Sequence, residues 1–132
     1  MRDRWGFLPL RAVVGVTFIM HGGLKLFSMG IPGTTRMMAG MGIPLPGIAA
    51  VGVIAVEMIA GLAILLGAFT RAAAVLLACD MLGVILFAKL HGGFFAPRGS
   101  ELELALLGAC LTLAAVGPGG FSIDGARQAR GG

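Results

Sequence analysis

The chain has 132 residues, of which 58% are hydrophobic and only 12% are charged, and its mean hydropathy is +0.98. This composition excludes an ordinary soluble domain and indicates one integral membrane domain over residues 1–132. The net charge of +4 comes from Lys and Arg placed singly, without a basic run or interleaved aromatic residues, so the lipid bilayer is an expected partner and nucleic acid is not.

The first apolar stretch runs from about 7 to 29 and carries Arg11, His21 and Lys25. Its uncharged core is followed by HGGLK and not by the small-residue cleavage pattern of a signal peptide, so we expect a retained helix. His21 and Lys25 are spaced i, i+4 and therefore share one helical face. Arg11 lies near the start of this helix, where we expect it to reach a lipid phosphate or a helix end.

The connection at 30–46 is expected to contain a short interfacial helix. Thr34 or Thr35 would cap this helix, and Gly42 and Pro44 would end it. The methionines expected on one of its faces are Met37, Met38 and Met41. Thioethers in such a group can form a soft-metal site or a lid, but an apolar face packed on lipid or on the bundle is commoner, and we favour it.

The second apolar stretch, about 47–70, contains a single interior charge, Glu57. A helix of this length covers the ~30 Å hydrocarbon core of a membrane, and an unpaired carboxylate at mid-depth is costly there. We therefore expect Glu57 to have a basic partner on the first helix, either His21 or Lys25.

The third apolar stretch, about 72–91, follows after only a few residues, so it should form an antiparallel hairpin with the second. Asp80 and His91 are nearly in phase on a helix and are both expected to face inward. Lys89 should point the opposite way and extend to the membrane interface.

The fourth apolar stretch, about 101–117, is short for a spanning helix, with Glu103 expected on its inner face. Glycine and proline end it, and residues 118–132 form a short polar tail that we expect to be frayed at its end.

Together these stretches predict an all-α integral membrane four-helix bundle with antiparallel up-down topology. An even number of spans puts both termini on one side, which the positive-inside rule makes cytoplasmic. The arginines on that side are Arg2, Arg4, Arg71, Arg127 and Arg130, and those on the other side are Arg36 and Arg98.

Helical phase and depth gather the ionisable residues in the outer half of the bundle. The residues expected to line this polar interior are His21, Lys25, Glu57, Asp80, His91 and Glu103. Such groups can simply neutralise one another and fix helix register. So many ionisable groups are nevertheless rare within a membrane, and we favour a polar small-molecule pocket.

Two narrower alternatives stay open. His21 and His91 are the only histidines and are conceivable haem ligands, although their expected depths differ by about two turns, ~10 Å. Cys79 and Cys110 fall at similar depths and form a candidate thiol pair, although buried thiols more often act as small hydrophobes. No recognisable motif for a metal, flavin or iron–sulfur centre occurs in the sequence.

The chain resembles the DoxX family of small bacterial membrane proteins over nearly its whole length, in the ordered segments RAVVGVTFIMHGGLKL, MGIPLP, VEMIAGLAILLGAFTR and GPGGFSID. His91 before the last span and Glu101 or Glu103 at its start add to the resemblance. Gly120 and Phe121 stand where family members usually carry Arg and Tyr. The resemblance implies a multi-pass protein of the bacterial inner membrane.

The resemblance also implies an association with redox chemistry, because some members are named as subunits of a thiosulfate:quinone oxidoreductase and others as partners of redox-protection proteins. We therefore expect an accessory component of quinone-linked or thiol-linked membrane redox chemistry, with a quinone as candidate ligand. If it is catalytic, it is an oxidoreductase subunit to which a partner supplies electrons. The alternative is a non-enzymatic scaffold or assembly factor that docks a redox enzyme, and a second copy of the chain is the other expected partner.

Overall fold

The computed structural model describes residues 7–131, and within this range the chain is helical and contains no strand. Three continuous helical runs, Leu8–Gly40, Pro46–Leu66 and Thr70–Lys89, are long and apolar enough to cross a membrane. A fourth apolar helix, α6 (Glu101–Val116), has 16 residues and is shorter. This confirms the prediction of an all-helical chain with membrane-length apolar helices.

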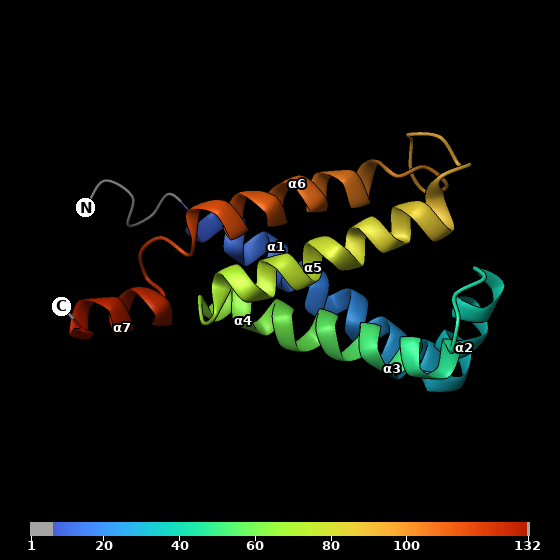
Figure 1. Ribbon diagram of the computed structural model, residues 1–132, viewed down its shortest axis with the longest axis horizontal. Coiled ribbons are helices and arrows are strands. Elements are labelled where there is room, and N and C mark those ends of the chain that lie inside the picture. The colour runs from blue at the N-terminus through green and yellow to red at the C-terminus, as the bar shows by residue number, and fades with distance from the viewer. Residues whose placement is uncertain (1–6, 132) are drawn as a thin grey trace.

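The first run consists of α1 (Leu8–Gly23), the π-helical segment η1 (Leu24–Met29) and α2 (Gly30–Gly40). Gly30 has a φ of +72°, a conformation that glycine adopts without the steric cost of a Cβ. The helix axis changes direction here, so that α2 packs against both η1 and α3 (Pro46–Ala55) in Figure 1.

The predicted capping of α2 by Thr34 or Thr35 is wrong, because the helix begins earlier, at Gly30. Both hydroxyls donate to carbonyls instead of accepting from backbone N–H groups. Thr35 Oγ1 donates to the carbonyl of Ile31 within the helix, at 2.7 Å. Thr34 Oγ1 donates to the carbonyl of Lys25, at 3.0 Å, and so joins α2 to η1.

The second run continues from α3 through the π-helical segment η2 (Val56–Ala60) into α4 (Gly61–Leu66). The third run consists of α5 (Thr70–Val84) and the π-helical segment η3 (Ile85–Lys89). Residues 67–69 alone connect α4 to α5, and the two helices pack against each other. Helix α6 lies along α5 and also contacts α1 (Figure 1).

The core is formed by small and medium apolar side chains that these helices bury between them. Its buried members are Val14, Phe18, Ala60, Ile64, Ala73, Ala74, Leu77, Ala78, Met81, Leu106, Cys110 and Leu113. Many large apolar side chains, such as Phe27 and Ile59, are exposed on the outside. Apolar side chains on both the inside and the outside are what a lipid-embedded protein requires.

Three glycines bring α1 close to the second run. A Cβ added at Gly61 would lie 3.1 Å from the carbonyl oxygen of Gly15, and one added at Gly15 would lie 2.9 Å from that of Gly61. A Cβ at Gly22 would lie 2.5 Å from Met58 Cγ. We call Gly15, Gly22 and Gly61 the glycine seam; it sets the short distance between the two backbones.

Arg11 is fully buried at the end of the molecule where α4 and α6 terminate. Its guanidinium donates to the carbonyls of Ile64 and Leu65 at the end of α4, each at 3.1 Å. It also donates to carbonyls in the segment that follows α6, those of Pro118, Gly120 and Phe121. Arg11 was expected to reach either a lipid phosphate or a helix end, and in the structure it binds the end of α4.

The polar tail contains a helix, α7 (Ile123–Gly131), drawn in red in Figure 1. The carboxylate of Asp124 accepts the backbone N–H groups of Phe69 and Thr70, each at 2.8 Å, and so caps the start of α5. The N–H of Asp124 donates to the carbonyl of Gly67 at 2.9 Å. These contacts fix the start of α7 on the α4–α5 connection.

Candidate functional site

The three π-helical segments each carry a charged residue that faces the interior. Lys25 lies in η1, Glu57 in η2 and Lys89 in η3. A π-helical turn holds more residues than an α-helical turn, so it rotates the side chains that follow, and such turns often occur at functional sites. The site is therefore built where three helices depart from regular α-helical geometry.

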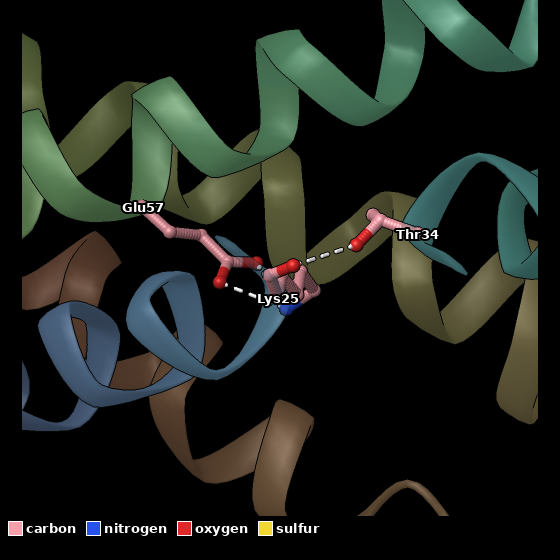
Figure 2. Close-up of polar contacts among 3 residues, drawn as sticks. All are labelled: Lys25, Thr34 and Glu57. Carbon is pink, nitrogen blue, oxygen red and sulfur yellow. Dashed lines mark hydrogen bonds and ion pairs between the residues drawn. The ribbon is translucent and has the colours of Figure 1, made fainter. Parts of the chain in front are cut away.

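Lys25 is the basic partner of Glu57. Its Nζ donates to both carboxylate oxygens of Glu57, each at 2.9 Å, as Figure 2 shows. Glu57 is 1% exposed and the Lys25 side chain is 15% exposed. The buried Thr34 holds the Lys25 carbonyl from α2, and Gly22 lets η2 approach α1. The structure thus confirms the expected ion pair and selects Lys25 over His21.

Asp80 of α5 completes a group of three ionisable side chains. Its carboxyl is close enough to share a hydrogen bond with Glu57, and it lies within the electrostatic range of Lys25. Its Oδ2 atom is buried and has no hydrogen-bond partner among residues 7–131. We call Lys25, Glu57 and Asp80 the polar triad. Because it combines one cationic and two acidic groups, a single proton retained on a carboxyl makes it neutral.

Glu103 is buried on the inner face of α6, as expected, but its neighbour is Lys89. Lys89 Nζ lies 3.5 Å from Glu103 Oε1 and also donates to the carbonyl of Pro97. The prediction that Lys89 points away is wrong. The prediction that His91 faces the interior is also wrong, because His91 is exposed in the turn after η3. The π-helical segment changes the phase that regular α-helical spacing assigns to Lys89, whereas His91 lies beyond the end of the helix, where helical spacing no longer applies.

His21 lies beside the polar triad without pairing with Glu57. Together with Lys25, Glu57 and Glu103 it lines a small interior cavity of about 70 Å³. This volume is large enough for about two water molecules. The cavity places residues from the first, second and fourth helices around one polar space.

A larger cavity of about 500 Å³ is also lined by Lys25. The ionisable residues that line it are Lys25, Asp80 and Lys89. The remaining residues that line it are Met37, Met38, Met41, Ile43, Ala49, Gly52, Val53, Cys79, Gly83, Val84, Phe87 and Ala88. We call this space the methionine cavity. The methionines expected on one face of the short helix therefore line a cavity that is also lined by three ionisable residues.

The two alternatives left open by the sequence can be placed in the structure. Cys79 and Cys110 are both free thiols; Cys79 is exposed beside the methionine cavity and Cys110 is buried in the core. His21 lies in the interior whereas His91 is exposed. Among the residues that the structure describes, no group of three His, Cys, Asp or Glu side chains is arranged to hold a metal ion.

Comparisons with known proteins agree with one another. The family model described as DoxX matches residues 6–90. The inner membrane protein YphA of Escherichia coli is 35% identical over 123 residues, which cover 89% of this chain and 86% of that protein. A Bacillus subtilis protein named "Putative oxidoreductase CatD" is 32% identical, over 90% of this chain and 84% of its own. The inner membrane protein YqjF of Escherichia coli is 37% identical over 123 residues, which cover 90% of this chain and 89% of that protein. No solved structure matches the chain.

Proposed function

The chain belongs to the DoxX family, and on that premise we propose that it is an accessory component of quinone-linked or thiol-linked membrane redox chemistry. In this proposal a small redox-active molecule, with a quinone as the candidate, binds in the methionine cavity. The observation that carries the proposal is that a largely apolar cavity of about 500 Å³ has Lys25, Asp80 and Lys89 among the residues that line it. One relative carries the name "Putative oxidoreductase CatD", which supports the redox assignment.

The chemistry of the cavity suits such a ligand. Thioether and aliphatic side chains provide a polarisable, adaptable surface for a ring and an apolar chain. The ionisable groups among the lining residues can exchange hydrogen bonds and protons with ring oxygens. In this proposal the electrons that a quinone accepts or delivers are exchanged with a partner enzyme.

We infer that α1–η1, the second and third runs and α6 span the bacterial inner membrane as a four-helix bundle, with both termini in the cytoplasm. Two of the relatives are named as inner membrane proteins, which supports the location. In a Cys79→Ser/Cys110→Ser background, new cysteines replacing Arg36 or Arg98 should react with an impermeant maleimide added outside spheroplasts. A cysteine replacing Arg71 should not react, and the opposite pattern would reverse the orientation.

Glycines of the cavity wall allow a direct binding test. A Cβ at Gly83 meets no heavy atom within 4 Å, so Gly83→Leu should fill part of the cavity without disturbing the fold. Gly108 of α6 is equally open and exposed, and Gly108→Leu is the matched control. Purified protein in nanodiscs should bind tetramethyl-1,4-benzoquinone or its hydroquinone in calorimetric titrations. Gly83→Leu should weaken binding at least tenfold and Gly108→Leu should not.

The same experiment addresses the scaffold alternative. If neither form of the probe binds the wild-type protein, and Gly83→Leu still recovers the same partner enzyme from the membrane as wild type, the chain acts as a docking scaffold. Equal binding by Gly83→Leu and wild type would instead place the ligand outside the methionine cavity.

A further inference from the structure

Another charged cavity lies at the end of the bundle where α4 and α6 terminate and α5 begins (Figure 1). It has a volume of about 300 Å³ and shares no lining residue with the methionine cavity. The residues that line it are Phe69, Thr70, Arg71, Ala72, Pro118, Asp124, Arg127 and Gln128. We call this space the arginine cavity.

Two arginines from different helices line the arginine cavity. Arg71 of α5 is positioned by its Nη1, which donates to the carbonyls of Ala114 and Ala115 at the end of α6. Arg127 of α7 lies over the ring of Phe69, with 5.3 Å between its Cζ and the ring centroid. In the described part of the chain, neither guanidinium lies within ion-pair distance of a carboxylate. A guanidinium carries more N–H donors than these contacts use, so both arginines can donate to a further acceptor.

The single acidic residue of the cavity wall does not neutralise both arginines. The Asp124 carboxylate accepts the backbone N–H groups of Phe69 and Thr70, each at 2.8 Å, and is thus engaged in capping α5. It also interacts electrostatically with Arg127. Because the other lining residues besides Arg71 are uncharged, the cavity keeps an excess of positive charge. An anion whose oxygens accept hydrogen bonds from two guanidinium groups matches this charge.

Apolar side chains beside the cavity favour an anion that belongs to a lipid. Phe69 is 66% exposed, and Phe121 and Ile123, just before and at the start of α7, are 46% and 45% exposed. Two helical runs of membrane length meet at this end, which therefore lies at the boundary between hydrocarbon and headgroups. A phospholipid can place its phosphate on the arginines and its acyl chains on the apolar side chains, whereas a free phosphate ion would use only the arginines.

We propose that the arginine cavity binds the phosphodiester group of an anionic phospholipid, with Arg71 and Arg127 as its hydrogen-bond donors. The inference goes beyond the proposed function and does not depend on a ligand in the methionine cavity. The bound phosphate joins α7 to the start of α5 and the end of α6, because Arg127 lies on α7 and Arg71 contacts α6.

Titration with two matched lipids tests this site. Dioctanoyl phosphatidylglycerol is anionic, whereas dioctanoyl phosphatidylcholine has the same chains and phosphodiester but carries a compensating positive charge. Each is added to the full chain in uncharged maltoside micelles at low ionic strength, where charge interactions are least screened. Calorimetry should give a Kd for phosphatidylglycerol about tenfold lower than for phosphatidylcholine, which is about the effect of one charge-assisted hydrogen bond. Inorganic phosphate at the same concentration should not displace phosphatidylglycerol.

Three variants test whether the two arginines of the cavity are the donors. Arg127→Gln changes an exposed side chain of α7, and the preference for phosphatidylglycerol should fall to about threefold or less. Arg71→Gln should reduce it similarly. Arg130→Gln is the matched control, because it removes the same charge from α7 at a residue that does not line the cavity, and it should keep the wild-type ratio.

Three results would overturn the proposal. Equal affinity of the wild-type protein for the two lipids would show that the cavity does not select an anionic headgroup. An equal loss of preference in Arg130→Gln and Arg127→Gln would indicate attraction to the basic surface of α7 as a whole. Displacement of phosphatidylglycerol by inorganic phosphate would show that the cavity takes a free ion and not a lipid. Should Arg71→Gln not fold, the comparison of Arg127→Gln with Arg130→Gln decides.

Discussion

The second helical run meets its neighbours in two different ways. On the side of α1, the glycine seam leaves no room for a side chain, because a Cβ at Gly61 would already lie 3.1 Å from the Gly15 carbonyl oxygen. On the side of the methionine cavity, a Cβ at Gly52 or at Gly83 across from it meets no heavy atom within 4 Å. Glycine thus brings backbones together in one region and leaves space in the other. The close region fixes the ion pair, and the open region can admit a ligand.

The largest effect is expected from the ion pair that joins the two regions. Lys25→Met leaves the carboxylate of Glu57 buried without a counter-charge, and breaking such a buried pair typically costs about 3–5 kcal/mol. We expect this loss in the free energy of unfolding, measured by reversible denaturation in mixed micelles.

A double-mutant cycle checks the origin of this loss. Lys25→Met/Glu57→Leu removes both members of the pair and should be more stable than Lys25→Met alone, because no uncompensated charge remains. His21→Gln is a control from the neighbouring turn and should have a smaller effect. Strictly additive losses in the cycle would show that the two side chains do not stabilise each other.

The next effect compares the two kinds of glycine directly. Gly61→Leu must push α1 away from the second run, and overpacking of this kind costs about 1–3 kcal/mol or more. Gly83→Leu meets open space and replaces glycine in a helix by a better helix former, so its effect should be within about 1 kcal/mol. Similar losses for both variants would contradict the distinction between a closed and an open side.

The sequence was sufficient to predict the parts of the fold that depend on which residues can lie in lipid and which need a polar partner there. Long apolar stretches predicted membrane-length helices, and the cost of an isolated carboxylate predicted a basic partner for Glu57 on the first helix. The choice of Lys25 over His21 needed the backbone distance that Gly22 permits, which residue spacing does not contain.

The errors in the site have two physical causes, both at the end of the third run. Phase arguments assume regular α-helices, but η3 rotates the residues near the end of the third run. Lys89 therefore reaches Glu103. The helix then ends at Lys89, two residues earlier than predicted, so His91 lies in an exposed turn to which helical phase does not apply. The methionine cavity was also not predictable, because the same glycine can mark a close contact or a space, and only the packing of α2 decides which.

The smallest effect on stability is expected at the end of the molecule near α7. Hydrogen bonds hold the segments together there, whereas close packing at glycines does so in the glycine seam. Asp124→Ala removes the acceptor for the N–H groups of Phe69 and Thr70, and loss of such a cap costs about 1 kcal/mol. The glycine seam should be unaffected, so the ion pair of Lys25 should keep its contribution in this variant.

The stabilisation that Asp124 provides as a cap should depend on pH. Partial burial raises the pKa of Asp124, but the N–H groups of Thr70 and Phe69 and the charge of Arg127 outweigh burial and lower the pKa overall. A folded-state pKa below the unfolded value of about 3.9 means that the stabilisation is fully present above about pH 4 and is lost as the pH falls through the folded value. The stability difference between wild type and Asp124→Ala, measured by denaturation from pH 7 to pH 3, should therefore be constant down to about pH 4 and then shrink. A difference that stays constant at pH 3 would mean that the carboxylate charge does not hold α7 in place.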